Sequence, residues 1–177
     1  MQSPCLKYLF IIFYRIIFYF ANLTNRYTIM QIKRADISHA QSIMNFQQKM
    51  AKETENIELD SEILNKGVRA VFNDSSKGIY YVALDNDKVI ASLLTTYEWS
   101  DWRNGCVLWI QSVYVLPKYR KKGIFNKMYI YIKTMVEQSD KYMGLRLYVD
   151  KTNLNAQEVY KRVGMDGEHY KLFEWFK

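Results

Sequence analysis

The sequence predicts one α/β domain built on a mixed β-sheet with helices on both faces. Apolar residues recur at helical spacing in four segments, and β-branched or aromatic runs separate these segments. One such run, residues 106–115, is almost continuously apolar and reads as a buried central strand. Helical and strand patterns that alternate in this way are typical of sheets covered by helices. The 177 residues suffice for one domain with a sizeable core.

The first half of the domain reads as strand, helix, helix. Residues 30–35 predict a short strand, and Asp36 or Ser38 can cap the helix that follows. A second helix is predicted over residues 61–72. The apolar positions that support these helices are Ile43, Met44 and Phe46 in the first and Ile63, Leu64, Val68 and Val71 in the second.

The second half adds strands and two more helices. Polar residues 85–88 interrupt two β-branched runs, which indicates an antiparallel hairpin before the central strand. A helix follows Gly123, and a second one ends near Gly164. The remaining elements are a strand at 144–149, a helix at about 153–163 and a closing strand at 169–176. The predicted order is β-α-α-β-β-β-α-β-α-β.

Residues 1–29 are a hydrophobic extension that differs in composition from the rest. Within residues 6–23 the only charged side chains are Lys7 and Arg15. A membrane span needs about 20 apolar residues, and Arg15 near its middle would be costly. We expect one domain at 30–177, with Met30 as the true start. An N-terminal membrane anchor is the alternative.

Composition excludes several classes of protein. The net charge is +7, and the three cations of residues 1–29 leave only +4 for the remainder, which argues against a nucleic-acid-binding face. Cys5 and Cys106 form no disulfide framework, which fits a reducing, cytoplasmic location. His39 and His169 have no ligand-like neighbours, so no metal site is expected.

The stretch "KYRKKGIFNKM" (118–128) predicts an anion site. Arg120, Lys121 and Lys122 precede Gly123, and a helix begins with Ile124. The first turn of a helix has unpaired N–H groups, and a glycine lets an oxygen approach the backbone closely. Such a site can hold a phosphate or diphosphate. A solvated basic turn without a ligand is the alternative.

A second motif follows the basic loop. The stretch "LYVDKTNLNAQEVYKRVGM" presents Val149, Asn153, Ala156, Tyr160, Gly164 and Met165. Together the two motifs resemble the GNAT superfamily of N-acetyltransferases, whose corresponding patterns are (R/Q)-x-x-G-x-(G/A) and V-x-x-x-N-x-x-A-x-x-x-Y-x-x-x-G-F. The resemblance covers about residues 30–175. It implies the GNAT-like acyl-CoA N-acyltransferase fold with splayed central strands.

The resemblance implies acetyl-CoA as the co-substrate and no metal. The main chain of Val113, Tyr114 and Val115 would pair with the pantetheine arm, as an added strand would. The loop from Arg120 to Phe125 would hold the diphosphate. Phe125 departs from the small residue usual there, and we expect it to point into the core. Asn153 would contact the cofactor arm, cap its helix, or do both.

The resemblance also assigns the chemistry. Tyr160 matches the tyrosine that protonates the departing CoA thiolate. For the base, Gln111 lies near the position of a family glutamate and cannot serve, so Glu98 or Asp101 would act directly or through a water.

The acceptor is predicted to be a small cationic primary amine. Glu98 and Asp101 alternate with Trp99 and Trp102, and carboxylates beside aromatic faces suit an ammonium group. A packed surface turn is the alternative for this segment. Rival functions are a CoA-binding regulatory module without chemistry and an acetyltransferase for protein amino groups. Assembly as a homodimer is left open.

Overall fold

A computed structural model of the chain describes residues 30–175. The predicted extension at 1–29 and its anchor alternative lie outside the described residues, so the start of the domain at Met30 stays a prediction. The elements are β1 (Met30–Arg34), α2 (Ala40–Glu55), α3 (Ser61–Asn73), β2 (Ile79–Asp85), β3 (Lys88–Ser100), β4 (Gly105–Val115), α4 (Ile124–Glu137), β5 (Tyr142–Arg146) and α5 (Leu154–Arg162).

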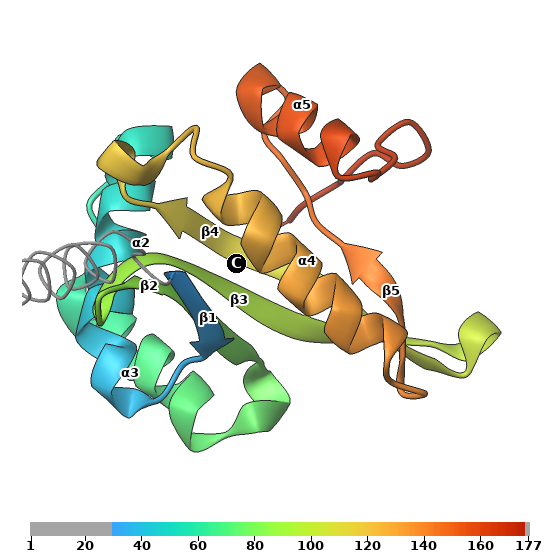
Figure 1. The fold of residues 1–177 in the computed structure, drawn as a ribbon, viewed down its shortest axis with the longest axis horizontal. Coiled ribbons are helices and arrows are strands. Elements are labelled where there is room, and N and C mark those ends of the chain that lie inside the picture. Colours follow the sequence, from blue (N-terminus) through green and yellow to red (C-terminus); the bar gives the residue numbers. More distant parts are fainter. Residues whose placement is uncertain (1–29, 176–177) are drawn as a thin grey trace, which may run out of the picture. The chain divides into compact units, whose positions relative to one another are not determined.

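The sheet is mixed and five-stranded, with the order β1-β2-β3-β4-β5 (Figure 1). Strands β2, β3 and β4 pair antiparallel, whereas β4 and β5 pair parallel. This arrangement confirms the predicted mixed sheet and the predicted order of elements through α5.

Helices cover both faces of the sheet. On β2, Val82 packs into a buried cluster with Ile43 of α2 and Val68 of α3. The adjacent Tyr81 packs instead against Tyr131 of α4, with ring centroids 5.9 Å apart. Since neighbouring residues of a strand point to opposite faces, α2 and α3 lie on one face and α4 on the other.

The predicted closing strand is wrong for the residues that are described. Residues 168–175 form no strand, and Tyr170 and Phe173 are 83% and 90% exposed. The alternation of this segment satisfies strand preference, but such preference produces a strand only against a pairing partner. The fifth strand also ends at Arg146 rather than at 149.

The early end of β5 produces the splay of the central strands that the sequence predicted. Pairing between β4 and β5 runs from Cys106–Tyr142 to Trp109–Arg146. Residues 110–115 of β4 pair only with β3. The backbone on their other side therefore has no strand partner among the described residues.

A β-bulge lies within the part of β4 that has a strand partner on the β3 side only. Between the pairs Leu94–Gln111 and Ser92–Tyr114, β4 has two residues where β3 has one. Ser112, the first of the two, has a left-handed φ of 52°. A bulge of this kind bends its strand and increases the local twist, which turns the end of β4 away from β5.

Candidate functional site

The N-terminus of α4 is open to an anion. Gly123 has a left-handed φ of 72°, and no side chain caps the helix. A Cβ placed on Gly123 would have no atom within 4 Å outside its chain neighbours, so the space on that side of Gly123 is open. The first N–H groups of α4 therefore face an accessible position.

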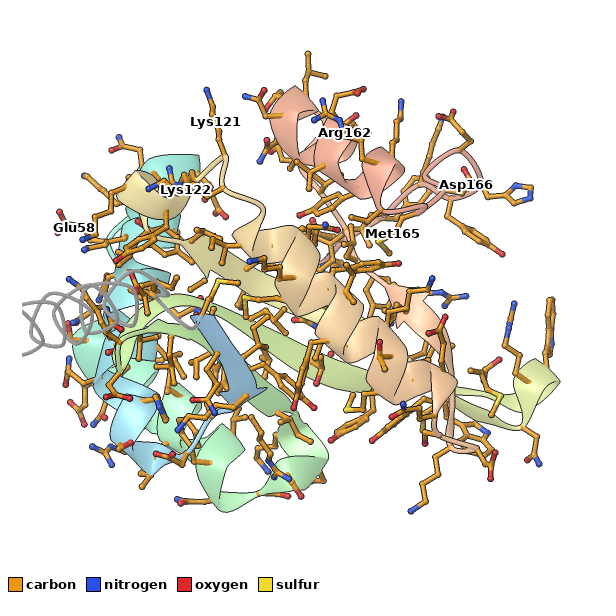
Figure 2. All side chains as sticks on the ribbon, viewed as in Figure 1. Glu58, Lys121, Lys122, Arg162, Met165 and Asp166 are labelled. Carbon is orange, nitrogen blue, oxygen red and sulfur yellow. The ribbon has the colours of Figure 1, made fainter. Side chains whose placement is uncertain are left out.

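Lys121 and Lys122 add positive charge beside this helix end. Both are exposed, and neither forms an ion pair within the described part of the chain. They lie on the turn that precedes α4, and the Lys121 side chain points away from the sheet (Figure 2). The ammonium of Lys122 lies 5.5 Å from the centroid of the Tyr119 ring. Their charges are thus available to a ligand.

Arg120 is held by the chain itself. Its Nε donates to the Val115 carbonyl at 2.9 Å, and its Nη2 donates to Glu53 Oε2 at 2.6 Å. Its guanidinium also lies 5.2 Å from the centroid of the Tyr114 ring. Direct contact of Arg120 with a diphosphate stays a prediction. The contacts that Arg120 makes within the chain indicate a structural role.

The strand predicted to line the pantetheine arm lies along the splay. Val113 and Val115 are half-buried, whereas Tyr114 is buried and packs on Phe46 with ring centroids 5.2 Å apart. The Tyr114 hydroxyl donates to Glu53 Oε1 at 2.6 Å. Burial, followed by this hydrogen bond, raises the pKa of Tyr114 to about 12. Its phenol is therefore a fixed donor and does not titrate near neutral pH.

Tyr160 lies beside the start of α4. Its ring meets that of Phe125 edge-on, with centroids 5.3 Å apart. Phe125 is half-buried and packs on Tyr160 and Tyr129, so the expectation that it fills the core is wrong. The reason is that Phe125 lies in the first turn of α4, where α5 is its neighbour. Burial raises the pKa of Tyr160, which keeps its proton bound at neutral pH.

Asn153 caps α5. Its Oδ1 accepts from the Ala156 N–H at 3.0 Å, and the side chain is otherwise exposed. The capping alternative is thus confirmed, and the cofactor contact stays a prediction.

Glu98 lies at the inner end of the splay, with partners that the sequence did not indicate. Trp109 Nε1 donates to Glu98 Oε2 at 2.5 Å, and Arg146 donates to Oε1. The hydrogen bond from Trp109, followed by that from Arg146, lowers the pKa of Glu98 against the opposing effect of burial. Trp109 and Arg146 form the last pair of the β4–β5 ladder. The one available signal was an arginine within an apolar strand.

Gln111 lies just beyond this pair on β4. It is half-buried, and its Nε2 donates to Thr96 Oγ1 at 2.6 Å. Since residues two apart on a strand share a face, Gln111 and Trp109 line the same side of the sheet. Gln111 therefore borders the splay, and its contact with an acceptor stays a prediction.

The other predicted acceptor residues lie elsewhere. Trp99 and Trp102 are 63% and 90% exposed, and Asp101 Oδ1 accepts from the Trp102 N–H in a surface turn. Trp99 pairs with Cys106, at the closed end of the β4–β5 ladder and about 30 Å along β4 from Val115. Figure 1 shows this β3–β4 connection at the opposite end of β4 from the start of α4. The structure does not bring these three side chains to Tyr160.

A mixed sheet that opens beside β4, with an uncapped basic helix start next to it, is typical of acyl-CoA N-acyltransferases. The sequence matches the acetyltransferase (GNAT) family model over residues 40–165, and the chain belongs to this family. Among residues 30–175 no group of three or more His, Cys, Asp or Glu could hold a metal ion. No helix in the same range is long and apolar enough to cross a membrane.

Solved structures of other proteins share this fold. A possible acetyltransferase from Clostridium difficile 630 is 45% identical, with a TM-score of 0.78 over 84% of this chain and 97% of that chain. A predicted acetyltransferase with acetyl-CoA from Clostridium acetobutylicum is 18% identical, with a TM-score of 0.65 over 82% and 96%. An aminoglycoside acetyltransferase from an uncultured soil metagenomic sample, in complex with sisomicin, is 16% identical, with a TM-score of 0.67 over 84% and 95%. No curated protein matches the chain.

Proposed function

We propose that this chain transfers the acetyl group of acetyl-CoA to a small primary amine. The amine would attack the thioester directly while donor and acceptor are both bound. The observation that carries the proposal is the position of Tyr160, which lies against Phe125 in the first turn of α4. A donor whose diphosphate lies at this turn would extend its thioester end along β4 toward the splay.

The donor site rests on backbone groups. Residues 110–115 have no strand partner on the β5 side, and their main-chain groups there, apart from the Val115 carbonyl that accepts from Arg120, suit the amides of a pantetheine arm. The N–H groups of α4, with Lys121 and Lys122, suit the diphosphate. One similar structure contains acetyl-CoA, which supports the choice of donor.

Tyr160 is the proposed general acid. As the new C–N bond forms and the C–S bond breaks, negative charge develops on the sulfur, and the phenol donates its proton there. Because burial raises the pKa of Tyr160, the protonated form is present throughout the neutral range. Solvent then returns the proton to the phenol.

Glu98 is a weaker candidate for the base than the sequence suggested. Both of its oxygens accept hydrogen bonds, and its lowered pKa reduces its affinity for a proton. Asp101 lies on the distant surface turn. We therefore assign Glu98 to orienting the ammonium group, with water taking the proton that the amine loses.

The surroundings of Glu98 support two classes of acceptor. Glu98 and the Trp109 ring support a small cationic amine, and one similar structure is an aminoglycoside acetyltransferase in complex with sisomicin. Arg146 offsets the charge of Glu98, which supports an acceptor that also carries a carboxylate. Polyamines and aminoglycosides represent the first class, and amino acids represent the second.

The experiment is acetyl-CoA-dependent thiol release over cationic amines, amino acids and peptides. Turnover on small amines is the expected result. Turnover on peptide amino termini alone would establish the protein-directed alternative. Binding of coenzyme A without turnover on any acceptor would establish the regulatory module. Absence of coenzyme A binding would overturn the proposal.

A further inference from the structure

Glu53, in the last turn of α2, joins three parts of the domain that are distant in sequence. Its Oε1 accepts from the Tyr114 hydroxyl and its Oε2 from Arg120 Nη2, both at 2.6 Å. These partners are 61 and 67 residues further along the chain. One carboxylate thus connects α2 with the end of β4 and with the loop before α4.

Arg120 is fixed on three sides. Besides Glu53, it bonds the Val115 carbonyl at 2.9 Å and lies over the Tyr114 ring. A guanidinium held by a carboxylate, a carbonyl and an aromatic face has a defined orientation. The Cα of Arg120 therefore has a defined position at the start of the loop.

The loop that begins at Arg120 has an unfavourable backbone. Lys121 has a φ of 61° and Gly123 a φ of 72°, so two of the three residues before α4 are left-handed. The conformation is readily available to glycine and costs a lysine about 1 kcal/mol. Such a turn persists only when its ends are held.

We propose that Glu53 is a positioning residue for the donor's diphosphate. By fixing Arg120 it holds the left-handed turn that presents Lys121, Lys122 and the first amides of α4. The inference rests on the proposed function, because it assumes that the diphosphate lies at this helix start.

The direction in which one substitution changes the affinity for coenzyme A tests this role. The negative charge of Glu53 disfavours a nearby anion, so on charge alone Glu53→Gln would strengthen coenzyme A binding. The same result would follow if Glu53 merely withheld Arg120 from the diphosphate. If Glu53 positions the loop, Glu53→Gln weakens binding instead.

The experiment is calorimetric titration of the whole chain with coenzyme A, together with steady-state kinetics. For Glu53→Gln we expect the Kd and the KM for acetyl-CoA to rise about 5- to 10-fold, with kcat changed less than about twofold. An acetylated pantetheine, which has no diphosphate, should show no such loss. Tighter or unchanged coenzyme A binding, or an equal loss with the truncated donor, would overturn the inference.

Glu58→Gln is the matched control. It makes the same change of charge a few residues further on, at a side chain that is 87% exposed and 3.8 Å from Lys52 (Figure 2). Its Kd for coenzyme A should stay at the wild-type value. Equal weakening by both substitutions would show a general charge effect and would overturn the role of Glu53.

Two further variants separate positioning from loss of folding. Tyr114→Phe removes only one hydroxyl from the network and should raise the Kd about two- to threefold. Glu53→Gln combined with Arg120→Gln should weaken binding by less than the product of the single effects, since both act through one contact. Additive effects would contradict the inference. If the wild-type chain itself does not bind coenzyme A, the proposed function fails, whereas normal wild-type binding with an unaffected Glu53→Gln variant removes this inference alone.

Discussion

The two sides of the splay are built in different ways. On the proposed donor side, one continuous stretch from β4 through the loop to α4 provides main-chain groups, a glycine turn and two exposed lysines. On the proposed acceptor side, Glu98, Trp109 and Arg146 come from three strands, and they meet only because of strand register.

The difference teaches which kind of site a sequence can reveal. A backbone site requires glycine and helix-start residues at fixed spacing, and these are visible locally. A side-chain site depends on contacts such as that between Glu98 and Arg146, which are 48 residues apart. Substitutions on the two sides of the splay should therefore affect donor binding and acceptor binding separately.

The largest expected effect is that of Tyr160→Phe. Removing the phenol's proton should lower kcat about 100-fold or more, because sulfur then leaves without a general acid. The Kd for coenzyme A should be unchanged, since the ring and its contact with Phe125 remain. Steady-state kinetics measure kcat, and calorimetry measures the Kd. An unchanged kcat would remove Tyr160 from the mechanism.

Glu98→Gln should weaken acceptor binding and leave donor binding unchanged. We expect the KM for a cationic amine to rise about tenfold, while the Kd for coenzyme A stays constant. The pKa of Glu98 is lowered from its ordinary 4.5, so its carboxylate stays charged above that pH, and acceptor binding should weaken only as the pH falls below it. Acceptor KM measured between neutral pH and about pH 4 tests this. A transition near neutral pH would assign acceptor binding to another group.

Lys121→Ala and Lys122→Ala should each weaken coenzyme A binding about threefold at low salt. Both ammonium groups are exposed, so their attraction for a diphosphate is screened, and the effect should shrink between about 0.05 M and 0.5 M salt. Calorimetry at both salt concentrations measures it. Lys66→Ala on α3, whose ion pair with Glu62 is exposed, is a control that should not change the affinity.

The fold was predictable wherever a segment carries its own signal. The apolar run at 106–115 gave β4 almost residue for residue, and the helices differ from their predicted bounds by a few residues at most. The closing strand failed because a strand also needs a neighbour, and Tyr170, Phe173 and Trp175 remain exposed.

The candidate site was predictable on the donor side only in part. The motif marked Gly123, and the structure adds that this residue is left-handed. The motif marked Arg120, whereas its partner Glu53 comes from α2, 67 residues earlier, where no motif marks it. On the acceptor side, four residues within the five positions 98–102 were assigned to one site. Strand register instead places Glu98 at the splay, whereas Trp102 lies in a surface turn after β3.

The smallest expected effect is therefore that of Trp102→Ala. The side chain is 90% exposed at the far end of β4, so its removal should change the free energy of unfolding by less than about 0.5 kcal/mol. The acceptor KM should also stay at the wild-type value, because Trp102 lies beyond the β4–β5 ladder and away from Glu98. Thermal denaturation and acceptor titration measure the two quantities. A severalfold rise in KM would restore Trp102 to the acceptor site and would mean that the acceptor extends along the whole of β4.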